Sequence, residues 1–228
     1  MRKTRFVNGE IYHVYNRGTD KRIIFSDNED VERFIQSMEE FNVIEPIGSI
    51  YENSFILKSN HVTVLKSQGK KEKLVNFIAY CLNPNHYHFL LEQVADRGIE
   101  KFMQRLGNGY TKYFNNKNKR SGVLFQGKFK SVHIDSNEYL LHVSAYVNLN
   151  NRVHKLGHRM SKLEIVKSRS SWGEYMGDNK LGNGFCKKDI ILGQFKNVDD
   201  YRNFAEHSLK FTLSHRGKDD IATPFLLE

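Results

Sequence analysis

The chain has 228 residues, of which 39% are hydrophobic and 27% are charged, and it contains only two cysteines. A chain of this length buries a core of its own and suits one domain of moderate size, with or without an appendage. The composition excludes a largely disordered chain and a disulfide framework, and no apolar run reaches the roughly 20 residues of a membrane span. We therefore expect a folded protein of the cytoplasm that does not enter a membrane.

The charge is strongly positive. Thirty-five Lys and Arg residues stand against 26 Asp and Glu residues, which gives a formal net charge of +9. This excess favours a polyanionic partner, and nucleic acid is the first candidate. Many basic proteins bind no nucleic acid, however, so the motifs must decide.

The first third of the chain predicts a strand, a helix and an insert. Ile11, His13 and Tyr15 alternate with their neighbours in residues 10–18, as in a strand. A helix over residues 26–41 follows, with Ser26 or Asp27 as its cap. Residues 44–73 mix short β-rich pieces with turn residues and predict an inserted loop or hairpin.

The middle of the chain predicts further strands and helices. Two apolar runs, 74–82 and 86–92, are separated by the turn signal NPN and predict paired strands. Residues 97–117 carry one apolar stripe at helical spacing, although two glycines weaken this helix. A strand over 122–134 and a helix over 135–151 complete the series.

This order of elements is typical of an α+β fold, an antiparallel sheet with helices on one face. Asp135 and Glu138 have capping-box spacing at the start of the last of these helices. We place a first domain at residues 1–157, insert included, and a C-terminal appendage at 158–228. Within the appendage, residues 197–211 predict one amphipathic helix.

The segment LNPNHYHFLLEQ sets two histidines one residue apart in a predicted strand. Residues two apart in a strand point to the same face, so His86 and His88 project together and Tyr87 points away. Two neutral imidazoles can hold a divalent ion if a third ligand arrives from another element. In isolation, such a pair is more often two partly solvated histidines.

A second pair lies in AYVNLNN, where Tyr146 and Asn150 are four residues apart and share a helix face. The amide oxygen of Asn150 suits Mg²⁺ or Mn²⁺, and a phenol nearby can attack a phosphate. Spacing alone favours the alternative, in which Tyr146 continues a buried stripe with Tyr139 and Val143. His142 is one turn from Tyr146 and in reach of its proton, but a capping or solvent-facing role is favoured.

Four ordered motifs together resemble the single-tyrosine HUH transposases of the IS200-like family, particularly the REP-associated tyrosine transposases. They are YHVYNRG, NPNHYHFLLE, GYTKYFNNKNKRSGVLFQGKFKS and YLLHVSAYVNLNNRV. The resemblance covers about residues 6–157. One departure is Asn151, where the family commonly has proline, and the insert at 44–73 is longer than a minimal member needs.

The resemblance implies a ferredoxin-like, RRM-like palm with His86 and His88 as metal ligands, Asn150 as the third ligand and Tyr146 as the nucleophile. It implies Mg²⁺ or Mn²⁺ as the cofactor. The implied reaction is cleavage of single-stranded DNA near a hairpin, which leaves a 5′-phosphotyrosine and a free 3′-OH. Because the phosphotyrosine conserves the energy of the broken bond, a 3′-OH can later rejoin the strand without ATP.

Basic residues interleaved with aromatic ones indicate where DNA would bind, because such a surface follows phosphates and stacks bases. A solvated basic hairpin over buried aromatics, and a frayed basic terminus, explain the same residues equally well. The candidates are Arg2, Lys3, Arg5, Arg17, Lys112, Lys117, Lys119, Arg120, Lys128 and Lys130.

Three functions fit these observations. The first is a DNA-cleaving and strand-joining transposase, and the second is a nickase of the same superfamily that serves replication or DNA transfer. The third is a non-catalytic regulator that binds hairpin nucleic acid. We expect a monomer by default, with a homodimer as the alternative.

Overall fold

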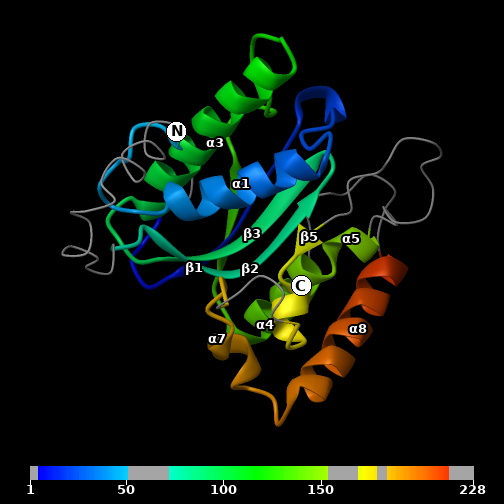
Figure 1. The fold of residues 1–228 in the computed structure, drawn as a ribbon. Coiled ribbons are helices and arrows are strands. Elements are labelled where there is room, and N and C mark those ends of the chain that lie inside the picture. Colours follow the sequence, from blue (N-terminus) through cyan, green and yellow to red (C-terminus); the bar gives the residue numbers. More distant parts are fainter. Residues whose placement is uncertain (1–4, 51–71, 154–168, 179–183, 216–228) are drawn as a thin grey trace.

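The computed structural model describes residues 5–50, 72–153, 169–178 and 184–215. Its centre is a five-stranded antiparallel sheet in the order β4-β1-β3-β2-β5 (Figure 1). The strands are β1 (Ile11–Arg17), β2 (Val75–Asn83), β3 (His86–Gln93), β4 (Lys130–Ile134) and β5 (Arg169–Ser170).

Helices of very different length surround this sheet. The long ones are α1 (Asn28–Glu40), α3 (Gly98–Lys117), α4 (Asn137–Asn148) and α8 (Val198–His215). The short ones are η1 (Thr19–Lys21), α5 (Asn150–Val153), α6 (Trp172–Tyr175) and α7 (Asp189–Leu192).

The first four strands with α1 and α3 form a ferredoxin-like unit. Their chain order is β1-α1-β2-β3-α3-β4 and their order in the sheet is 4-1-3-2, all antiparallel. The predicted α+β fold class is therefore confirmed. Both helices of this unit pack on one face, where Phe34 of α1 and Phe102 of α3 join Phe89 of β3 in one buried cluster.

The opposite face of the sheet is covered as well, which corrects the prediction of helices on one face only. Ile78 and Leu90 contribute to a second buried cluster with Val143 of α4 and Tyr201 of α8. The cause lies in β2 and β3, which are apolar along both faces. Strands of that kind need cover on both sides.

Three local predictions have different outcomes. Asp27 caps α1, since its Oδ1 accepts a hydrogen bond from the backbone N–H of Asp30 at 2.9 Å. The capping box at α4 is wrong, because Ser136 is the cap there. The last predicted strand begins only at Lys130. The preceding residues form a loop that pairs with the chain just after β1 through an isolated bridge between Gly18 and Phe125.

The described part of the C-terminal appendage packs directly on the sheet. β5 pairs with β2, and the Tyr175 hydroxyl donates to the carbonyl of Ile78 at 2.9 Å. The boundary at residue 157 stays a prediction, and most of the insert at 44–73 lies outside the described residues. Among the helices that the structure describes, none is long and apolar enough to cross a membrane.

Candidate active site

His86 and His88 lie near the start of β3, on the face of the sheet that α4 covers. Both are buried, and their rings are perpendicular with centroids 5.2 Å apart. The pairing with β1 sets His86 opposite Arg17 and His88 opposite Tyr15. Two imidazoles therefore face one small volume between the sheet and α4, as the alternation of the strand predicts.

The last turn of α4 brings the other two predicted residues to the same place. α4 ends at Asn148 and Asn150 begins the short helix α5, yet the Asn150 Oδ1 atom lies 3.2 Å from His86 Nε2. Tyr146 is 4% exposed, and its ring stands perpendicular to that of His88 with centroids 5.5 Å apart. Tyr146 is thus both a core residue and a neighbour of the histidines.

Two asparagines that the sequence analysis did not select hold His86 in place. The Asn85 Oδ1 atom lies 2.6 Å from His86 Nδ1, so this nitrogen carries the proton and His86 Nε2 keeps its lone pair. The amide of Asn83 donates to that lone pair at 2.9 Å and to Asn150 Oδ1 at 2.7 Å. Both asparagines belong to the turn signal NPN between the two predicted strands, so the sequence placed them next to His86.

His13 of β1 is a further buried residue that the sequence analysis did not select. Its Nε2 atom lies 2.9 Å from His88 Nδ1, and the two rings stack with centroids 5.1 Å apart. Burial lowers the pKa of His13 to about 3, so the ring is neutral at physiological pH. His13 shares one face of its strand with Ile11 and Tyr15, so the period-2 pattern already marked its position.

His142 faces away from this site. Its Nδ1 atom lies 3.0 Å from the Ser208 hydroxyl and its ring contacts Phe204, both in α8. Among the described residues, no three His, Cys, Asp or Glu side chains are grouped so as to hold a metal ion. The two imidazoles and the Asn150 amide are the available ligands.

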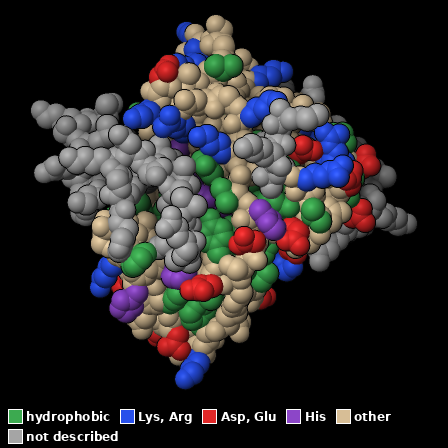
Figure 2. Space-filling view, turned by 180° about the vertical axis from the view of Figure 1, so that it is seen from behind, with side chains coloured by type: hydrophobic (Ala, Val, Ile, Leu, Met, Phe, Trp, Pro, Cys, Tyr) green, Lys and Arg blue, Asp and Glu red, His purple; other side chains and the backbone are tan. Residues whose placement is uncertain are grey.

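The predicted DNA-contact residues that the structure describes lie mainly near the end of α3 and in the loop that follows. In Figure 2, most Lys and Arg side chains of that view lie in its upper half, the end of the molecule where α3 ends. Lys112, Lys119, Lys128 and Lys130 are exposed, as is Arg5. Arg2 and Lys3 lie outside the described residues.

Three of the predicted contact residues already have partners in the protein. Arg120 donates to Asn115 Oδ1 at 2.6 Å, and Arg17 bonds to Gln126. The ammonium of Lys117 binds three carboxylates of α1 and its cap, at 2.8 to 3.1 Å. Because these charges neutralise Lys117 inside the fold, we leave it out of the proposed DNA surface.

Comparison with known families gives a match to the region that contains this site. Residues 48–150 match the family described as Transposase IS200 like. This part of the chain is similar to the IS200-like transposases. The matched region includes His86, His88, Tyr146 and Asn150, whereas His13 lies before it.

One solved structure that resembles this chain is described as a REP-associated tyrosine transposase bound to a REP hairpin. The match covers 78% of this chain and 85% of that chain, with a TM-score of 0.45 and 9% sequence identity. No curated protein matches the chain.

Proposed function

We propose that this protein is an IS200-like transposase that cleaves and rejoins single-stranded DNA near hairpins, with Tyr146 as the nucleophile. His86, His88 and Asn150 would bind the divalent ion, Mg²⁺ or Mn²⁺. One observation carries the proposal: the last turn of α4 sets the Tyr146 ring against His88 and is followed at once by Asn150, 3.2 Å from His86. The preference for hairpin DNA rests on the sequence motifs.

The residues present fit a divalent ion. The lone pairs of His86 Nε2 and Asn150 Oδ1 both accept from the Asn83 amide nitrogen. The same two lone pairs would attract a cation. Imidazole nitrogen and amide oxygen suit Mn²⁺, and amide oxygen also suits Mg²⁺. When bound, the ion would polarise the scissile phosphate and offset its negative charge.

The rest of the chemistry falls to the phenol. The Tyr146 oxygen attacks the phosphorus, the bond from phosphorus to the 3′ oxygen breaks, and the phenol proton passes to the leaving 3′ oxygen. The downstream strand stays on the protein as a 5′-phosphotyrosine. A 3′-OH that attacks this ester reverses the step and rejoins the strand, because the phosphodiester energy is conserved.

The test uses hairpin DNA labelled at its 3′ end, since attack by tyrosine keeps the downstream fragment on the protein. The labelled hairpin is mixed with Mg²⁺ or Mn²⁺ and run on a denaturing gel beside Tyr146→Phe. Tyr139→Phe, another tyrosine of α4, is the matched control. We expect a labelled band at protein mass for the wild type and Tyr139→Phe, and no band for Tyr146→Phe or with chelator. An adduct that persists in Tyr146→Phe would refute the assignment.

A second function has one observation in its favour. Tyr146 is almost fully buried and the Asn83 amide occupies the lone pairs of two proposed metal ligands, which favours a regulator that binds hairpins without cutting them. Tight hairpin binding by the wild type without any adduct would establish that regulator. A nickase would give the same adduct, so only a strand-joining assay with a second labelled 3′-OH distinguishes it from the transposase.

A further inference from the structure

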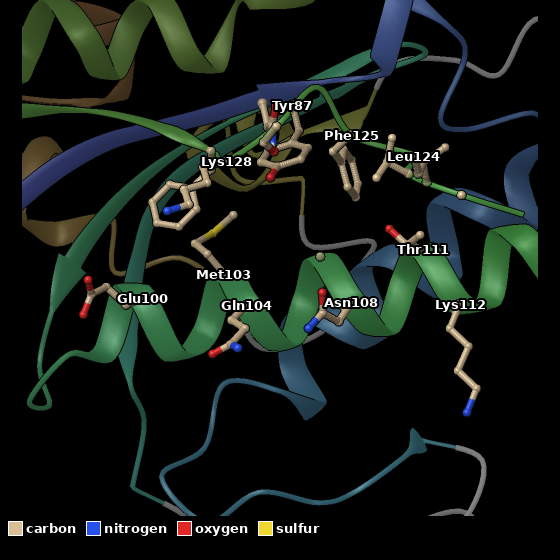
Figure 3. A pocket seen from close by; sticks show the side chains of 16 residues that line it. Tyr87, Glu100, Met103, Gln104, Asn108, Thr111, Lys112, Leu124, Phe125 and Lys128 are labelled. Carbon is tan, nitrogen blue, oxygen red and sulfur yellow. The ribbon is translucent and has the colours of Figure 1, made fainter. Parts of the chain in front are cut away.

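Asn83 is the last residue of β2 and lies on the same face of the sheet as the two histidines of the proposed metal site. It pairs with His86, and residues directly opposite each other in neighbouring strands share a face. Tyr87 marks the other face, where it lines the hollow along α3 that Figure 3 shows. Asn83 is fully buried, although asparagine is disfavoured in strands.

In the described contacts, the side chain of Asn83 bonds only to other side chains of this site. Its Nδ2 atom donates to His86 Nε2 at 2.9 Å and to Asn150 Oδ1 at 2.7 Å. Its Oδ1 atom accepts from the Cys81 thiol at 3.7 Å. None of these bonds satisfies a backbone group. A buried amide costs free energy unless it is bonded, so the site explains this asparagine and the strand does not.

The atoms that meet at Asn83 have the spacing of metal ligands. Asn83 Nδ2, His86 Nε2 and Asn150 Oδ1 form a triangle with sides of 2.7, 2.9 and 3.2 Å. Neighbouring ligands of an octahedral ion, with bonds of about 2.1 Å, lie about 3 Å apart. The triangle therefore matches one face of an octahedron, and Asn83 occupies one of its corners.

An amide nitrogen offers a cation no lone pair, so this corner needs the other end of the Asn83 amide. A half turn about the last side-chain bond exchanges Nδ2 and Oδ1, which have nearly the same size. Cys81 suits both orientations, because a thiol is a weak donor and a weak acceptor. It bonds to Oδ1 in one orientation and to Nδ2 in the other, so the turned amide keeps a partner on that side.

We propose that Asn83 is a fourth ligand of the divalent ion and that its amide turns over when the ion binds. The N–H of Asn83 holds the lone pairs of His86 and Asn150 until the ion takes them, and Asn83 Oδ1 then completes the ligand set. The inference rests on the proposed function, because it takes the divalent ion of that site. A second amide oxygen favours Mg²⁺ and Mn²⁺, which prefer oxygen ligands.

Asn83→Leu distinguishes a ligand from a side chain that only competes with the ion for the lone pairs. Leucine has a similar size, but it neither donates a hydrogen bond nor binds a metal. We expect the Mn²⁺ affinity, measured without DNA by the EPR signal of the free ion, to fall at least about tenfold, since the loss of even an outer partner costs that much. Removal of a competitor would raise the affinity, so unchanged or tighter binding overturns the proposal.

Asn76→Leu is the matched control, with the same substitution in the same strand. The amide of Asn76 donates to Glu92 Oε2 at 2.8 Å, away from the metal site. This variant should bind Mn²⁺ as the wild type does, and Tm shows that both variants are folded. An equal loss of affinity in Asn76→Leu would assign the effect to the strand and overturn the proposal.

Asn83→Cys gives a second measurement, because a thiolate in direct contact with Co²⁺ produces a charge-transfer band in the near ultraviolet. We expect this band when Co²⁺ is added to Asn83→Cys. We expect none in the wild type, which contains Cys81, and none in Asn85→Cys, since Asn85 contacts His86 at Nδ1. Absence of the band in Asn83→Cys overturns the proposal. Failure of the proposed function would appear separately, as the absence of any Tyr146 adduct in a wild type that binds Mn²⁺.

Discussion

The hydroxyl of Tyr201 in α8 accepts a hydrogen bond from the side-chain amide of Asn148 in α4, at 2.9 Å, and both residues are fully buried. The other end of the Asn148 amide accepts from the Ser171 hydroxyl at 2.6 Å. Asn148 stands between Tyr146 and Asn150 in the sequence. The C-terminal appendage thus fixes the end of α4, with the proposed nucleophile two residues before Asn148 and the proposed third ligand two residues after it.

Tyr201→Phe should therefore impair adduct formation out of proportion to its effect on stability. The variant keeps the ring but leaves the Asn148 amide with one unsatisfied buried donor, which costs about 1–3 kcal/mol of unfolding free energy. Tyr110→Phe is the matched control, because its buried hydroxyl donates to the backbone carbonyl of Ile24 at 2.6 Å, on the other face of the sheet.

Urea unfolding and single-turnover adduct formation measure the two effects. We expect similar losses of unfolding free energy in both variants and a lower rate of adduct formation in Tyr201→Phe alone. Equal adduct rates at equal stability would mean that the network serves folding and does not position α4.

His13→Phe should weaken metal binding. For His88 to bind an ion through Nε2, its Nδ1 must carry the proton, and His13 Nε2 is the acceptor 2.9 Å away. Such a partner typically changes metal affinity by about 10–100-fold. Titration of Mn²⁺ followed by the EPR signal of the free ion, without DNA, gives the affinity directly.

His13→Gln offers the control for this effect, since its amide oxygen can accept the same hydrogen bond. It should recover part of the Mn²⁺ affinity that phenylalanine loses. If both variants bind Mn²⁺ as the wild type does, His13 has only a packing role beside Tyr146.

The sequence predicted the strands and helices better than it predicted which residues contact the proposed catalytic side chains. Period-2 alternation placed His86 and His88 on one face because strand geometry is local. The contacts of His88 with His13, across 75 residues, and of Asn148 with Tyr201 depend on which elements pack together, and spacing does not carry that information. The charge pattern predicted a basic surface around residues 112–130, yet it could not reveal that Lys117 is bound by carboxylates of α1 and its cap.

Lys117 is expected to matter for stability and hardly at all for DNA. Its partner Asp30 is fully buried and also accepts from the Tyr113 hydroxyl at 3.1 Å. Lys117→Met would leave that carboxylate without its cation, a change that costs 3–5 kcal/mol at fully buried pairs. Because the Lys117 side chain is 25% exposed, we expect a loss of about 2–3 kcal/mol in unfolding free energy.

The contribution of Lys117 to the unfolding free energy should depend on pH. The hydrogen bond from Lys117 is the main cause that lowers the pKa of Asp27 below 3.8, so this contribution is present above that pH and is lost as the pH falls further. Burial lowers the pKa of Lys117, but bonds to Asp27, Asp30 and Glu29 outweigh burial and raise it above 10.5. Its contribution is therefore lost only as the pH rises beyond that value.

Urea unfolding of the wild type and Lys117→Met across this range measures the difference. It should be largest between about pH 4 and pH 10 and shrink on both sides. Lys112 is an exposed lysine earlier in α3. Lys112→Met should leave the stability unchanged and should make hairpin binding weaker and less dependent on salt. Equal losses of DNA affinity in the two variants would return Lys117 to the DNA surface.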